Sequence, residues 1–126
     1  MQIKMKDILG FGSFYEEVKS QKLSMKVSYN IARLAKAVEQ ELAFYREKFT
    51  EIVREYGDKD ENGNPIPTSD GGVKIKPGLE HECYHAIDDL QNLEVELPDI
   101  TFSIEDFGNV EIEPITVNLI IPFIKE

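Results

Sequence analysis

One uninterrupted helical pattern constrains this chain more than any other feature. Between Ser24 and Gly57, apolar side chains recur at steps of three and four residues, the spacing of a single helix face. The members of this stripe are Val27, Ile31, Leu34, Val38, Leu42, Tyr45, Phe49, Ile52 and Tyr56. Ser24 suits the N-cap and Gly57 the C-cap. A helix of this length would be about 50 Å long, so its stripe must pack against a partner helix, in this chain or in another.

Two weaker patterns flank the long helix. Before it, the stretch "DILGFGSFYEEVKSQK" predicts a shorter helical segment, although Gly10 and Gly12 lower its helix propensity. After it, residues 58–77 are dense in turn-forming residues, with an Asn-Gly and an Asp-Gly step between short extended pieces. This composition predicts a small β-hairpin at the end of the long helix.

The C-terminal part mixes a helix with strands. The stretch "LEHECYHAIDDLQNL" predicts a helix, and the apolar alternation from Val95 to Ile104 predicts short strands with one buried face. Ser103 has the position of a helix N-cap, Pro114 that of a first helical turn, and Pro122 that of a helix end. The sequence therefore predicts a terminal helix after the strands.

Together these patterns predict an α+β fold in a single domain, since 126 residues are too few for two full cores. We expect a long antiparallel helical pair with a β-hairpin at its tip, and short strands plus a C-terminal helix at its base. The parts would be N-terminal helices in residues 1–57, the hairpin in residues 58–77, and an acidic helix-plus-strand part in residues 78–126.

The charge of the chain is divided unevenly along its length. Residues 1–77 carry 13 Lys and Arg against 12 Asp and Glu, whereas residues 78–126 carry one basic residue against 12 acidic ones. Such an acidic half repels phosphate, which disfavours direct nucleic-acid binding through it, but it attracts a basic protein partner. A solvated acidic face that aids solubility is the alternative. No apolar run approaches the roughly 20 residues of a membrane helix, and a single cysteine excludes an internal disulfide.

The stretch "HECYH" at residues 81–85 matches the H-E-x-x-H pattern of zinc hydrolases. In that interpretation His81, His85 and Glu105 would bind the metal and Glu82 would act as general base. On a helical wheel, however, both histidines lie opposite the apolar face that contains Cys83 and Leu90. A pair of solvent-facing histidines explains the same spacing, and we expect no cofactor.

The stretch "DKDENGNPIPTS" begins like a calcium-binding loop, with Asp58, Asp60 and Asn62 at the first, third and fifth positions. Ser69 stands at the twelfth position, where a calcium loop needs a bidentate Glu. A turn centred on Asn62 and Gly63 explains these residues as well.

Several short stretches resemble a family of small uncharacterised proteins encoded by tailed phages and prophages. They are "KLSMKVSYNIARLAKAVEQEL", "EYGDKDENGNPI", "DGGVKI", "LQNLEVELPDI" and "IIPFIKE". The resemblance implies the cytoplasm of a bacterial host, or the virion, as the location. It implies no catalytic residue, because the family has no established activity.

We therefore expect a non-enzymatic interaction protein with an acidic contact surface. Its expected members are Glu94, Glu96, Asp99, Glu105, Asp106, Glu111 and Glu113. One form of this hypothesis is an antagonist that occupies the basic nucleic-acid-binding surface of a host defence nuclease. The alternatives are a virion or assembly component that oligomerises through the long helix, and a zinc-dependent hydrolase.

Overall fold

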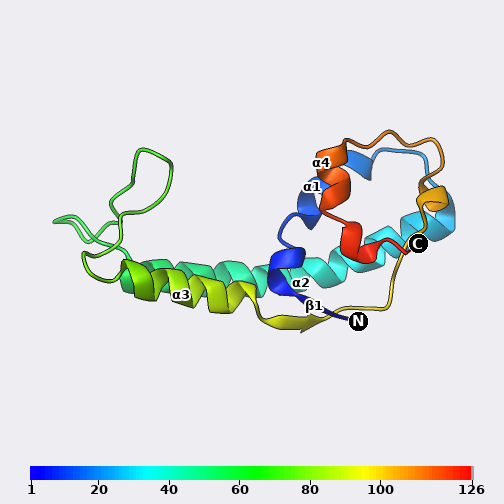
Figure 1. Ribbon diagram of the computed structural model, residues 1–126. Coiled ribbons are helices and arrows are strands. Elements are labelled where there is room, and N and C mark those ends of the chain that lie inside the picture. Colours follow the sequence, from blue (N-terminus) through cyan, green and yellow to red (C-terminus); the bar gives the residue numbers. More distant parts are fainter. Residues whose placement is uncertain (126) are drawn as a thin grey trace. The chain divides into compact units, whose positions relative to one another are not determined.

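The predicted long helix is present, and it contributes to two units of the structure. In the computed structural model, which describes residues 1–125, helix α2 spans Met25–Tyr56 (Figure 1). Its first part belongs to a unit formed by residues 1–42 and the chain from Glu94 onward, and its second part to a unit formed by residues 43–93. Both predicted ends are confirmed. The Ser24 hydroxyl accepts a hydrogen bond from the Val27 N–H at 3.2 Å, and Gly57 follows the last helical residue.

The first unit contains most of the short elements. They are strand β1 (Gln2–Lys4), 3-10 helix η1 (Met5–Asp7), helix α1 (Phe11–Val18), strand β2 (Glu94–Glu96), 3-10 helix η2 (Ile104–Phe107), helix α4 (Pro114–Asn118) and 3-10 helix η3 (Ile121–Phe123). Strands β1 and β2 pair antiparallel, with Ile3 opposite Val95. The partner strand β1 was not predicted, because three residues at the chain start are too few to show a period.

The core of this unit is aromatic. Phe14 is fully buried, and its ring meets those of Phe11 and Phe107 edge-on at centroid distances of 5.6 and 6.1 Å. Phe11 in turn contacts Phe123 of η3, so residues from opposite ends of the chain share one cluster. The first half of the α2 stripe, from Val27 to Val38, is buried.

The C-terminal predictions are partly confirmed. Ser103 begins η2 as predicted, and its N–H donates to the Asp106 carboxylate at 2.8 Å, half of a capping box. Pro114 opens α4 as predicted. The prediction for Pro122 was wrong, because α4 ends at Asn118 and Pro122 lies inside η3, where its fixed φ suits the first turn. Ile104 is 74% exposed rather than buried, since the chain leaves the extended conformation at η2.

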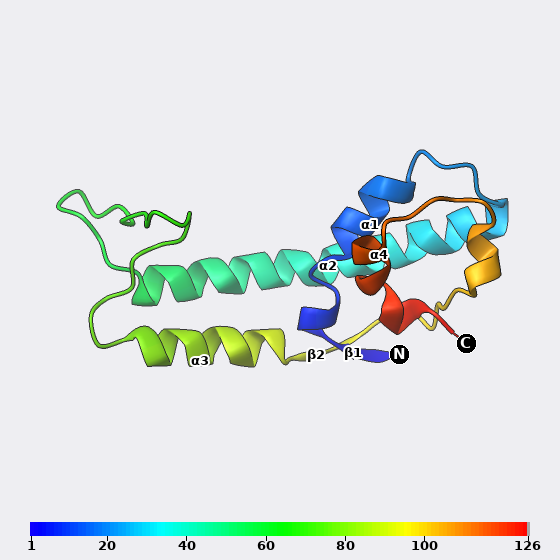
Figure 2. The same ribbon diagram turned by 45° about the horizontal axis from the view of Figure 1, so that its top comes forward.

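The second unit is a helical pair. Helix α3 (Glu80–Gln91) runs antiparallel to the second part of α2 and lies beside it in both ribbon views (Figures 1 and 2). Tyr45 and Phe49 of α2 stack at 5.8 Å, and the Gln91 side chain donates a hydrogen bond to the Tyr45 hydroxyl at 3.4 Å. This half of the stripe is only half-buried, whereas Cys83 and Leu90 of α3 are buried.

The segment that joins these two helices differs from the single hairpin that the sequence predicted. Three backbone hydrogen bonds connect Asp58, Ile66 and Lys74 in a closed ring. The Asp58 N–H donates to the Lys74 carbonyl at 2.7 Å, the Lys74 N–H to the Ile66 carbonyl at 2.8 Å, and the Ile66 N–H to the Asp58 carbonyl at 3.3 Å. The three residues are eight positions apart, so three short extended pieces meet at this ring. Gly63 turns the chain between two of them with a φ of 78°, in agreement with the predicted Asn-Gly turn.

Candidate protein-interaction surface

An apolar cavity of about 450 Å³ opens on the C-terminal part of the first unit. Its walls come from η2, the irregular segment 108–112, α4 and η3, which follow one another along the chain. The lining residues are Ile104, Phe107, Gly108, Val110, Ile112, Val117, Ile120, Ile121 and Ile124. No lining side chain can ionise, so the cavity favours apolar groups.

Several apolar side chains at this cavity are exposed. Of the lining side chains, Ile104 is 74% exposed, Ile121 55% and Val117 38%. A soluble domain exposes single apolar residues routinely, but a contiguous group around a cavity is typical of a binding surface.

Carboxylates alternate with the apolar lining. Val110 and Ile112 line the cavity. Glu111, which lies between them in the sequence, and Glu113, which follows Ile112, are exposed. Glu105 follows the lining residue Ile104 and is also exposed. We call the cavity with its exposed isoleucines and these three carboxylates the C-terminal docking surface. An apolar centre with an acidic edge fits a partner that carries an apolar anchor flanked by basic groups.

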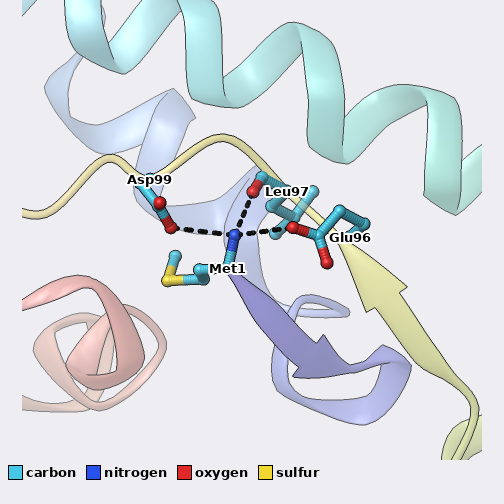
Figure 3. A network of polar contacts seen from close by, with 4 residues as sticks. All are labelled: Met1, Glu96, Leu97 and Asp99. Carbon is cyan, nitrogen blue, oxygen red and sulfur yellow. Dashed lines mark hydrogen bonds and ion pairs between the residues drawn. The ribbon is translucent and has the colours of Figure 1, made fainter.

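The remaining predicted acidic residues have other contacts. Figure 3 shows the α-amino group of Met1 between the carboxylates of Asp99 and Glu96, at 2.9 and 3.1 Å, with the Leu97 carbonyl as a third acceptor. The hydrogen bonds to Asp99 and then to Glu96 raise the pKa of this amino group. Asp106 accepts from the Ser103 N–H, so it stabilises η2.

Glu94 lies on β2 and is exposed. Together with Gln2, Ile3, Lys4 and Asp7 it lines a hollow that shares no residue with the apolar cavity. The seven predicted acidic residues thus separate into three at the docking surface and four at other positions of the same unit.

The histidines of the "HECYH" stretch face solvent, as the helical wheel predicts. His81 and His85 are exposed on α3, and the Nδ1 atom of His85 lies 3.2 Å from the Asp89 carboxylate, one helical turn away. Among residues 1–125, no three His, Cys, Asp or Glu side chains gather in a group that could hold a metal ion. The arrangement predicted for zinc, with Glu105 as third ligand and Glu82 as base, therefore has no assembled site in the described chain.

The residues of the calcium hypothesis serve a turn. The Asp60 carboxylate accepts hydrogen bonds from the N–H groups of Asn62 and Asn64 at 2.9 and 3.0 Å. Asp58 accepts from the Lys59 N–H and lies 3.7 Å from the Lys74 ammonium. Their oxygens thus face backbone amides and a cation, which is what the alternative turn interpretation expects.

Cys83 is 3% exposed on the inner side of α3, and burial raises the pKa of its thiol. A buried thiol with a raised pKa is a poor nucleophile, so we assign it to packing. Within residues 1–125, no helix combines the length and the apolar character needed to cross a membrane.

Comparison of the chain with known proteins identifies no relative. No family model matches the chain, and no curated protein or solved structure is significantly similar to it.

The sequence indicated the acidic edge of the surface but not its apolar centre. Ile104 was expected to be a buried strand residue, and Val117 and Ile121 parts of an ordinary terminal helix. The stretch "VEIEP" at residues 110–114 held a signal that was not used, since its apolar and acidic residues alternate.

Proposed function

We propose that this protein is a non-enzymatic interaction protein that binds a basic protein partner through the C-terminal docking surface. The observation that carries the proposal is the apolar cavity of about 450 Å³, which has exposed isoleucines and whose lining residues are followed in the chain by exposed carboxylates. A cavity of this size has room for large side chains, being within the roughly 300–1,000 Å³ range of protein pockets. Apolar anchors supply most of the affinity at such interfaces, whereas edge charges accelerate association and select the partner.

The proposed target is the basic nucleic-acid-binding surface of a host defence nuclease. The resemblance to proteins of tailed phages supports a target in a bacterial host. The acidic charge supports a surface that normally binds phosphate, because carboxylates can occupy the same basic groups. The protein would then inhibit by competing with nucleic acid.

The test begins with affinity capture from host lysate and continues with the captured protein in purified form. We expect the binding to weaken as salt is raised from 50 to 500 mM, because charges at an exposed edge are screened. We also expect the protein to displace labelled DNA from its partner. A captured protein that keeps its DNA at saturating concentrations of this protein would contradict nuclease antagonism.

Two variants locate the surface. The triple variant E105K/E111K/E113K reverses the edge charges, and Ile104→Asp places a charge at the apolar opening. Each should weaken binding to the purified partner on the order of tenfold or more. The control E47K/E61K/D88K makes the same change in net charge at exposed positions of the second unit and should bind normally. Equal weakening by the control would show a non-specific charge effect and overturn the proposal.

A further inference from the structure

A second charged surface lies on the exposed side of the first part of α2. Residues 19–38 contain five Lys and Arg and no Asp or Glu, in contrast to the acidic C-terminal part of the same unit. Three of these cations, Lys26, Arg33 and Lys36, are exposed on α2 itself.

This side of α2 also has an apolar centre. At 100° per residue, Met25, Tyr29 and Lys36 lie within about 40° of one another and directly opposite the buried stripe. Met25 is 84% exposed and Tyr29 61%, although both are large apolar side chains. Lys26 and Arg33 lie at one edge of this group. We call these five residues the basic face.

The basic face and the C-terminal docking surface carry opposite charges, and each has apolar side chains at its centre. The first is a convex helix surface with two protruding apolar side chains one turn apart, flanked by cations. The second is an apolar hollow of about 450 Å³, and exposed carboxylates follow its lining residues Ile104, Val110 and Ile112 in the chain. An amphipathic helix that places anchors one turn apart into an apolar groove is a common mode of protein recognition.

No ion pair within the described chain joins the two surfaces. Within residues 1–125, no carboxylate pairs with Lys26, Arg33 or Lys36, and no cation pairs with Glu105 or Glu111. Both sets of charges are therefore available to another molecule.

We propose that the basic face of one copy binds the C-terminal docking surface of a second copy, with Met25 and Tyr29 in the apolar cavity. This inference rests on the proposed function, because it uses the same docking surface. Self-association would mask that surface, and the basic partner would have to displace the second copy.

Nucleic acid is the other ligand that a basic face could bind. Two large apolar side chains at its centre favour a protein surface over a phosphate backbone, which contributes charge and no apolar hollow. The acidic segment in the same unit also repels nucleic acid.

The experiment measures the molar mass of the full chain by light scattering or sedimentation over a concentration series. We expect the wild type to associate increasingly with concentration at 50 mM salt and to dissociate at 500 mM. The basic-face variant K26E/R33E/K36E and the docking-surface variant E105K/E111K/E113K should each be monomeric. Circular dichroism and thermal unfolding confirm that they fold, which we expect because all six positions are exposed.

Mixing the two variants gives the sharpest outcome. Each variant alone presents like charges at the contact, whereas a one-to-one mixture presents opposite charges again, so association should return. A wild type that is monomeric at every concentration would overturn the inference. A mixture of the two variants that stays monomeric would also overturn it. The same holds if the wild type is a monomer that binds a labelled DNA duplex and K26E/R33E/K36E no longer binds that duplex.

The partner assay separates this inference from the proposed function. If the inference holds, K26E/R33E/K36E is monomeric and binds the purified partner at least as tightly as wild type, because its docking surface is no longer masked. If self-association occurs but E105K/E111K/E113K still binds the partner normally, the proposed function fails and the self-association stands.

Discussion

The two units of this protein use the same helix in different ways. In the first unit the α2 stripe is buried from Val27 to Val38, and Phe14 and Phe123 of the aromatic cluster are fully inaccessible. In the second unit the continuation of the stripe, from Tyr45 to Tyr56, is only half-buried. The buried apolar residues of this unit are Cys83 and Leu90, which belong to α3. A regular apolar period therefore specifies a helix, but it does not specify how completely the helix face is covered.

This difference bears on function, since both candidate surfaces belong to the well-packed unit. The docking surface lies on short elements with little stability of their own. They are held by contacts such as Phe14 with Phe107 and by the Phe102 N–H, which donates to the Phe123 carbonyl at 2.7 Å. The dense core thus orders the otherwise irregular elements of the candidate docking surface.

Truncation of one aromatic residue in each unit tests the comparison with the largest expected effect. Phe14→Ala should reduce the free energy of unfolding by about 3–5 kcal/mol, because it leaves a cavity in a dense core. Tyr45→Ala should cost about 1–2 kcal/mol, since Tyr45 is half-buried and loses one stacking contact and one hydrogen bond. Urea unfolding of both variants makes the measurement. Equal losses would show that the two units are packed alike.

Gly57 offers an intermediate test, confined to the second unit. A Cβ atom at this position would overlap the Val53 carbonyl, so Gly57→Ala must shift the end of α2. We expect a loss of about 1–3 kcal/mol, with faster hydrogen exchange at the amides of Asp58, Ile66 and Lys74. Gly12→Ala is the matched control, because its added Cβ meets open space. Unchanged exchange in the Gly57 variant would contradict the account of the ring.

The smallest effect concerns the Met1 amino group in the first unit. Its folded-state pKa is raised above the ordinary value of 8.0, so its stabilising contribution is present below about pH 8 and is lost as pH rises through the folded-state pKa. The melting temperature of wild type should exceed that of Asp99→Asn at pH 7, and the gap should narrow by pH 10. A gap that is constant or widens with pH would show that the ion pair contributes nothing.

Local signals explain which parts of the fold could be predicted from the sequence. Ser24, Ser103 and Pro114 act within one turn of their own element, and each was placed correctly. Contacts between distant segments left no local signal, and they include the pairing of β1 with β2 and the three-membered ring at residues 58, 66 and 74. The acidic edge of the docking surface was visible in the sequence, whereas the cavity depends on four separate elements meeting.

A methyl NMR dilution series on the wild-type protein tests the central claim most directly. We predict concentration-dependent shifts at Ile104, Ile121 and Met25, because the C-terminal docking surface of one copy receives the basic face of another. The methyl signals of Ile52 and Val73 in the second unit should not change. Shifts confined to Ile52 and Val73, or no change at any methyl group across the series, would contradict the account.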